Sequence, residues 1–291
     1  MLQDVFSQYP GALVGVVCIL GLLVGSFLNV VIYRLPKMLE REWKQYCGEI
    51  LELKETAQES TSKEEFNLVV PASTCPSCDH KIRAWENIPV ISYLFLRGRC
   101  SNCKSSISIR YPIIEAVTAA LSAVLAIKFG FGWQLAAALL LTWALISLTM
   151  IDIDTQLLPD NITLPLLWLG LILNSQGLFT SLTDALWGAV FGYLSLWSVY
   201  WIFKLLTQKE GMGYGDFKLL AALGAWMGWQ ALPVTILLSS VVGAVIGIAG
   251  ILIMGRDKNI PIPFGPYLAI AGWIYFMWGE TIVNAYLSLY K

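Results

Sequence analysis

Residues 133–160 read WQLAAALLLTWALISLTMIDIDTQLLPD and join a long apolar run to a group of acids. The run from Trp133 to Ile151 has no charged side chain, and as one helix it is long enough to cross the roughly 30 Å hydrocarbon core of a bilayer. Asp152, Asp154 and Asp160 follow directly. The segment therefore predicts a membrane-spanning helix that ends in a cluster of carboxylates.

The composition of the whole chain also indicates a membrane protein. Of its 291 residues, 57% are hydrophobic and 13% are charged, and the mean hydropathy is +0.65. Soluble domains carry about 25% charged residues, so a single soluble core fits this chain poorly. The apolar content excludes a disordered chain, and a formal net charge of −1 leaves no basic excess for binding nucleic acid.

Seven further apolar stretches resemble membrane spans. We therefore predict an all-α polytopic membrane protein with about eight transmembrane helices, at 11–33, 112–129, 133–151, 162–179, 185–206, 217–229, 233–254 and 264–287. The stretch 217–229 is shorter than the roughly 20 residues that a span needs. The first stretch is too long for a signal-peptide core and has no cleavage site after it, so we expect it to remain as the first helix.

Basic residues fall on one side of this predicted topology. With the N-terminus outside the cytoplasm, every lysine and arginine except Lys128 and Lys291 lies in or beside a cytoplasmic loop. This distribution follows the positive-inside tendency, and removing one span would destroy it. We therefore expect a multi-pass protein whose acids after residue 151 face the cytoplasm.

The one sizeable polar segment is the insert 34–111. In its first part, 37–67, apolar residues recur every three to four positions. A helix on the membrane surface and a solvated helix that packs on its own domain both fit this pattern. The predicted division is a first transmembrane helix at 1–33, a cytosolic insert at 34–111 and a transmembrane core at 112–291.

The second part of the insert holds two C-x-x-C knuckles, which resemble a four-cysteine zinc ribbon. Four thiolates complete the tetrahedral shell of zinc, so such a site is structural rather than catalytic. The alternative is a pair of disulfides or four thiols without a function, and the reducing cytoplasm disfavours the disulfides. The predicted ligands of a structural Zn²⁺ are Cys75, Cys78, Cys100 and Cys103.

The chain has a single histidine, His80, and this restricts its chemistry. A Ser-His-Asp triad would have to use a histidine beside a metal knuckle, and no H-E-x-x-H sequence is present. We expect His80 to be a surface residue rather than a ligand. The glycine-rich run 211–215 lacks both the preceding strand and the spacing of a dinucleotide site. The remaining candidates are acids at the membrane edge, after the third predicted span and, at Asp216, before the sixth.

Two carboxylates can hydrolyse a peptide bond without histidine or metal, one accepting a proton from water and the other donating one. Helix capping or loop solvation is an equally good explanation of Asp154 and Asp160, and capping also suits Asp216. The residues alone do not separate Asp152 from Asp154 as a catalytic candidate. A transporter that uses membrane-edge aspartates, and a scaffold whose insert recruits a partner, are the competing interpretations.

The ordered motifs resemble those of the bacterial type IV prepilin peptidases, which are membrane aspartic peptidases and N-methyltransferases. The matching segments span nearly the whole chain: Gly25–Val31 with Arg34–Pro36, Glu86–Pro89, the two knuckles, Asp152–Asp160, Gly213–Lys218 and Pro263–Pro266.

The resemblance implies that Asp152 and Asp216 are the catalytic aspartates. It also implies prepilin and pseudopilin substrates, cleaved after a Gly at the cytosolic edge of the bacterial inner membrane. The new N-terminal residue would then be methylated by S-adenosyl-L-methionine, for which no binding motif is visible. Neither the oligomeric state nor the path of the substrate is predicted, and no nucleic-acid partner is expected.

Overall fold

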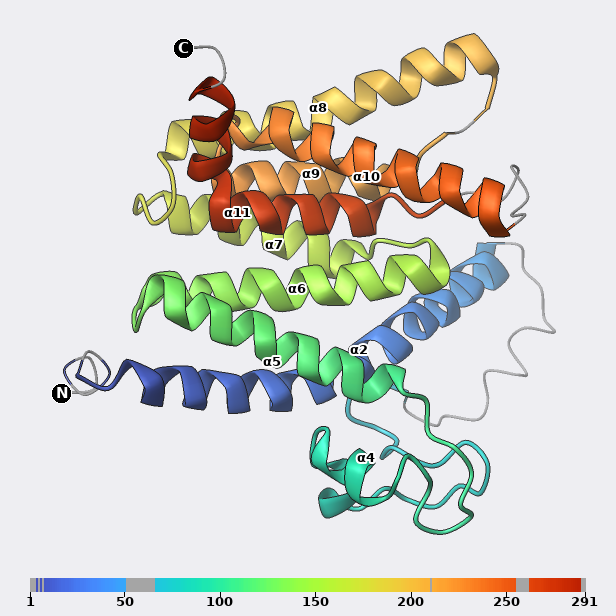
Figure 1. The fold of residues 1–291 in the computed structure, drawn as a ribbon. Helices are drawn as coiled ribbons and strands as arrows, with labels where there is room; N and C mark the ends of the chain where they lie inside the picture. Colours follow the sequence, from blue (N-terminus) through green and yellow to red (C-terminus); the bar gives the residue numbers. More distant parts are fainter. Residues whose placement is uncertain are drawn as a thin grey trace. The chain divides into compact units, whose positions relative to one another are not determined.

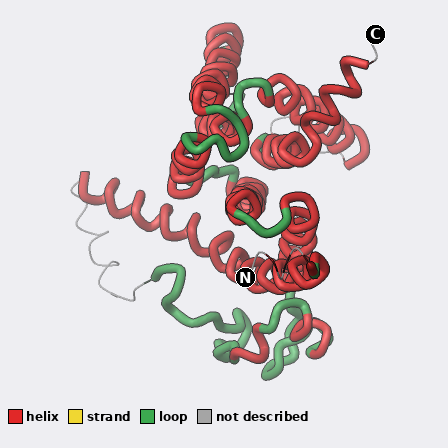
Figure 2. Tube along the Cα trace, turned by 90° about the vertical axis from the view of Figure 1, so that its left-hand side faces the viewer, coloured by secondary structure: helices red, strands yellow, loops and turns green. Residues whose placement is uncertain are grey.

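The structure is a computed structural model that describes residues 4, 6, 8–50, 66–209, 211–254 and 262–288. The regular elements of this part of the chain are all helices, as Figure 2 shows. The chain divides into two compact units, residues 1–139 and 140–291. The prediction of an all-α chain is confirmed.

The first unit pairs two long helices. Helix α2 (Pro10–Ile50) packs along α5 (Arg110–Phe129), and Figure 1 draws the two side by side. Glycines of α2 face α5 so closely that a Cβ at Gly25 would lie 2.7 Å from the Cα of Glu115. Small residues at such interfaces let the helix backbones approach each other, which is how membrane helices pack.

Helix α2 continues past Tyr33 and through Pro36 into the predicted insert. The side chains of Trp43, Tyr46 and Ile50 are exposed, so this part of α2 does not bury them against its own unit. Residues 51–65 lie outside the described part of the chain. They make up most of the rest of the segment 37–67, for which a helix was predicted.

Two buried charged residues attach the insert to these helices. The guanidinium of Arg34 donates to the carbonyls of Asn67 and Pro71, at 2.9 and 2.7 Å. The carboxylate of Glu115 accepts a hydrogen bond of 2.7 Å from the N–H of Val90. Between these attachments the insert forms the short helices η1 (Ala84–Asn87) and α4 (Ile91–Phe95).

The second unit is built around a short buried helix. Helix α9 (Tyr214–Met227) contacts α7 (Asp160–Asn174), α8 (Leu182–Thr207), α10 (Ala231–Met254) and α11 (Gly265–Ser288), and Figure 1 shows it among them. Every α9 residue from Asp216 to Trp226 is buried except Lys218. A Cβ at Gly192 of α8 would lie 2.7 Å from the carbonyl oxygen of Leu220, so α8 and α9 touch backbone to backbone.

A helix is present at each of the eight predicted spans, but the helices differ in length. Within the residues that the structure describes, five are long and apolar enough to cross a membrane: α2, α5, α6 (Trp133–Thr155), α8 and the Ala231–Gly250 part of α10. Helices α7 and α9 have 15 and 14 residues, or about 22 Å at about 1.5 Å per residue, which is less than a bilayer core. Helix α11 is interrupted by a non-helical residue at Trp278.

Candidate active site and metal centre

Asp152 lies in the last turn of α6 and points into the second unit. Its side chain is 5% exposed, and Leu148 and Ile151 on the same helix face are fully buried. Asp154 is exposed. A helix turns by about 100° per residue, so two acids two positions apart face opposite ways. The structure therefore distinguishes the two acids that the sequence left equivalent, since Asp152 is buried and Asp154 is exposed.

Asp216 lies in the first turn of α9 and is also buried. Its side chain is 6% exposed, and its Oδ1 atom has no hydrogen-bond partner among the described residues. A buried carboxylate oxygen without a donor is costly, and groups of this kind are concentrated where function needs them. Asp216 is therefore a candidate for direct contact with a substrate or a reacting water.

The two carboxylates lie where three helix ends converge: Asp152 accepts a hydrogen bond from the start of α11, and Asp216 is in the first turn of α9. Leu158 lies between the helices: a Cβ at Gly215 of α9 would be 2.7 Å from its Cβ, and one at Gly265 of α11 would be 3.1 Å from its Cδ1. The end of α6, the start of α9 and the start of α11 thus surround one small region.

Asp160 has a different partner from the other acids. Both its carboxylate oxygens accept hydrogen bonds from Nζ of Lys218, at 2.6 and 2.7 Å. This ion pair joins the first turn of α7 to the first turn of α9, two residues after Asp216. Asp160 therefore forms an exposed link between α7 and the helix that carries Asp216.

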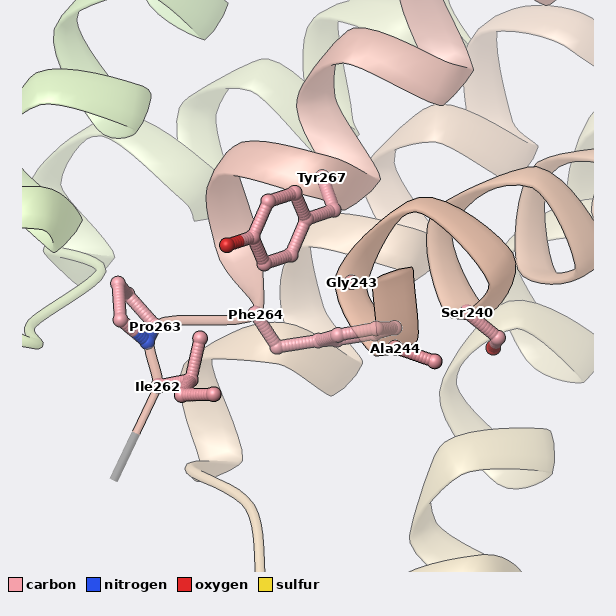
Figure 3. A pocket seen from close by; sticks show the side chains of 7 residues that line it. All are labelled: Ser240, Gly243, Ala244, Ile262, Pro263, Phe264 and Tyr267. Carbon is pink, nitrogen blue, oxygen red and sulfur yellow. The ribbon is translucent and has the colours of Figure 1, made fainter. Parts of the chain in front are cut away.

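A cavity of about 270 Å³ lies between α10 and the segment leading into α11. In Figure 3 the side chain of Phe264 extends toward Ala244 of α10, with Tyr267 on the α11 side. Phe264 directly precedes Gly265, whose backbone N–H donates to Asp152 Oδ2 at 3.0 Å. Phe264, which lines the cavity, is therefore followed directly by Gly265, the hydrogen-bond partner of Asp152.

The four predicted zinc ligands come together in the first unit. Their sulfur atoms all lie within 4.8 Å of one another, and Cys75 and Cys103 Sγ are 3.8 Å apart. With Zn–S bonds of about 2.3 Å, the sulfurs of a tetrahedral site lie about 3.8 Å apart, whereas a disulfide needs about 2.05 Å. The geometry fits one tetrahedral ion better than two disulfides.

The two knuckles share one backbone design. In each, the first cysteine N–H donates to the carbonyl five residues on, at His80 and Ser105, and its own carbonyl accepts from the residue four positions on. That fourth residue, Asp79 or Lys104, has a positive φ. This repeated turn directs both thiols of each knuckle toward the same point, as a zinc ribbon requires.

The surroundings of the thiols suit metal binding. Hydrogen bonds from Ser105 lower the pKa of Cys103 to about 6, which favours the thiolate that metals bind. The backbone N–H of His80 lowers the pKa of Cys78, but burial and the thiols of Cys103 and Cys75 outweigh it and leave that pKa raised. Gathering four thiols raises the cost of ionising all of them, and a bound cation offsets that cost.

His80 lies outside the group of four cysteines and pairs with Glu86, its Nε2 being 3.2 Å from Glu86 Oε2. Glu86 also accepts from the N–H of Arg83 at 2.8 Å. This N–H, then the hydroxyl of Ser101 and His80, lower the pKa of Glu86 to about 2. Since His80 belongs to the first knuckle and Ser101 to the second, the carboxylate of Glu86 links the two knuckles.

Comparison with known proteins shows the family to which this chain belongs. The bacterial peptidase A24 N-terminal domain matches residues 19–129, and the type IV leader peptidase family matches residues 139–248. Prepilin leader peptidase/N-methyltransferases of Stutzerimonas stutzeri and Pseudomonas aeruginosa are 62% and 60% identical to this chain, over 98% and 99% of it and 97% and 98% of their own lengths. The chain belongs to the type IV leader peptidase family. A relative of the same name from Legionella pneumophila is 47% identical over 99% of both chains, and no solved structure matches.

For this member of the type IV leader peptidase family, sequence reasoning pointed to both buried aspartates but missed their neighbours. Leu158 and Gly265 lie within the motifs Asp152–Asp160 and Pro263–Pro266, but the sequence predicts no role for either residue. Leu158 contacts Gly215 and Gly265, and Gly265 contacts Asp152. The residues of each pair lie far apart in the chain, so hydropathy and motif spacing do not reveal these contacts. The Pro263–Pro266 motif was the one available signal.

Proposed function

We propose that this chain is a membrane aspartic endopeptidase that removes the short leader of prepilins and pilin-like secretion proteins after a glycine. It then methylates the new N-terminal residue with S-adenosylmethionine. The observation that carries the proposal is the meeting of two buried carboxylates, Asp152 and Asp216, in a chain 62% identical to a prepilin leader peptidase/N-methyltransferase.

Two such carboxylates share the work of hydrolysis. The ionised one takes a proton from water while the water oxygen attacks the carbonyl carbon of the scissile bond, and the protonated one donates its proton to the carbonyl oxygen. The tetrahedral intermediate then collapses: the C–N bond breaks, the leaving nitrogen takes up the proton that the first carboxylate accepted, and a hydroxyl of the intermediate returns a proton to the second carboxylate as the new C=O bond forms. Two close negative charges repel each other, so a pair that holds one proton between them suits this cycle.

We place the site at the cytoplasmic edge of the bacterial inner membrane. The distribution of basic residues supports this orientation, because it puts the ends of α6 and α9 that carry the aspartates on the cytoplasmic side. In this arrangement 1–33 is the first membrane helix, 34–111 the cytosolic insert and 112–291 the peptidase core. A substrate with a basic leader in the cytoplasm and an apolar helix in the bilayer presents its scissile bond at that depth.

The cysteine cluster would hold a structural zinc ion through Cys75, Cys78, Cys100 and Cys103, whose sulfurs all lie within 4.8 Å of one another. Such an ion fixes the fold of the insert and takes no part in hydrolysis. S-adenosylmethionine supplies a methyl group to the amine that cleavage frees, and we assign it no residues. The transporter interpretation gains no support, because the two buried acids share one site instead of being spread along a path.

The test is cleavage of a purified prepilin by the purified chain in liposomes, followed by mass spectrometry of both products. Asp152→Asn and Asp216→Asn should each lower the rate by about 10²–10⁴-fold, the usual worth of a general acid or base. Asp154→Asn is the matched control, an exposed acid in the same helix turn, and should cleave at the parental rate. An inactive parent chain would refute the function, and active Asp152→Asn would refute the site. Labelled S-adenosylmethionine in the same mixture tests the methyl transfer.

A further inference from the structure

Asp152 accepts a hydrogen bond from the start of another helix. The backbone N–H of Gly265, the first residue of α11, donates to Oδ2 of Asp152 at 3.0 Å. The N–H groups in the first turn of a helix have no partner within that helix, and the helix dipole favours an anion there. Among the described residues, this is the hydrogen bond that fixes the rotation of the Asp152 carboxylate.

The hydrogen bond depends on residue 265 being a glycine. A Cβ at this position would lie 2.7 Å from Oδ2 and 3.2 Å from Cγ of Asp152, and 3.1 Å from Cδ1 of Leu158. Asp152 and Leu158 are both buried, at 5% and 7% exposed, so neither side chain has open solvent to move into. Any side chain at 265 therefore displaces either the carboxylate or the start of α11.

We propose that Gly265 is the positioning residue of Asp152. Its N–H holds Oδ2 in place and so leaves the other oxygen of Asp152 for the reacting water and the region of Asp216. The inference rests on the proposed peptidase function and extends it to a residue outside the two aspartate motifs. A carboxylate free to rotate is misaligned for part of the time, which slows the chemical step without weakening substrate binding.

The sharpest test removes the N–H without adding an atom that crowds the site. Cell-free synthesis with glycolic acid in place of Gly265 changes the amide into an ester. A hydrogen bond to a charged group contributes about 1.5–3 kcal/mol, so kcat for prepilin cleavage should fall by about 10- to 100-fold with KM unchanged. The matched control is the same change at Leu268 with its hydroxy-acid analogue, because the Leu268 N–H donates to the Phe264 carbonyl and to neither aspartate.

A second pair of variants separates positioning from crowding. Gly265→Ala should lower kcat at constant KM, and adding Leu158→Ala should not restore it, because the contact with Asp152 remains. Gly272→Ala is the control for crowding within α11: its Cβ would lie 2.6 Å from Cδ1 of Leu223, which is equally tight but away from the aspartates.

The outcomes are distinguishable. A parent chain that does not cleave prepilin refutes the proposed function and the inference with it. If the parent cleaves, three results overturn the positioning role alone: a Gly265 ester with parental kcat, equal losses in the Leu268 ester, or rescue of Gly265→Ala by Leu158→Ala. A loss of kcat confined to the Gly265 variants, with melting temperatures in detergent like those of their controls, supports it.

Discussion

Replacing Asn174 by alanine should destabilise the second unit, because this buried side chain makes four hydrogen bonds between helix ends. Its amide donates to the carbonyls of Ala225 and Trp226, at 2.8 and 3.1 Å, and its oxygen accepts from the N–H groups of Phe179 and Thr180, at 3.0 and 3.1 Å. At about 1 kcal/mol net for each bond the loss is about 4 kcal/mol. The two N–H groups are only partly buried and can find other partners, so we expect about 2–4 kcal/mol.

The assay is thermal unfolding of the purified chain in one detergent. A loss of that size corresponds to a drop in apparent melting temperature of roughly 5–15 °C. Asn174→Leu keeps a branched side chain of the same length without the hydrogen bonds and should melt as early as the alanine variant. Ser175→Ala is the control, because the exposed Ser175 bonds only locally to Ile172. The reasoning is refuted if the alanine and leucine variants melt with the parent.

Other predictions concern the ion pair and the insert. Lys218→Met should cost less than about 1 kcal/mol in thermal unfolding, because the carboxylate of Asp160 is half exposed and water weakens the pair. Chelation should release about one zinc per chain in metal analysis and make all four knuckle thiols reactive, and Cys75→Ser should prevent zinc binding. The pKa of Glu86 is about 2 in the folded chain, against an ordinary value of 4.5. The ionised Glu86 carboxylate therefore stabilises the folded insert fully above pH 4.5, and this stabilisation is lost as the pH falls toward 2. Glu86→Gln should remove that loss, measured as hydrogen-exchange protection of the Arg83 amide.

Hydropathy and cysteine spacing predicted the helices and the cysteine cluster, because both depend on residues close together in the sequence. Each of the eight apolar stretches contains a helix, because backbone groups kept from water must be hydrogen-bonded and a helix achieves this within one segment. The two knuckles predicted the cluster of four cysteines, because each C-x-x-C turn brings its two thiols together by itself. Hydropathy also marked 217–229 as unusual, and the reason is that α9 lies inside the unit, where a 14-residue helix is long enough.

The sequence could not choose between Asp152 and Asp154, since the choice depends on the rotation of α6 against the rest of its unit. A helix that is apolar all round shows no preferred face. The same reason hid Asn174: a lone amide in an apolar run gives no hint that four backbone groups, two of them about 50 positions away, converge on it. Contacts between distant residues decided both cases.

The electrostatics of the site also depends on a distant segment. Asp152 lies at the C-terminal end of α6, where the dipole of its own helix disfavours an anion, whereas Asp216 lies at the favourable N-terminal end of α9. From the sequence, the pair is therefore unequal. The start of α11 changes this balance, because its first N–H points at Asp152 and supplies what α6 cannot. If Gly265 positions Asp152 as we propose, α11 serves the chemistry of the site as well as its packing, and the glycine at 265 lets that helix come close enough.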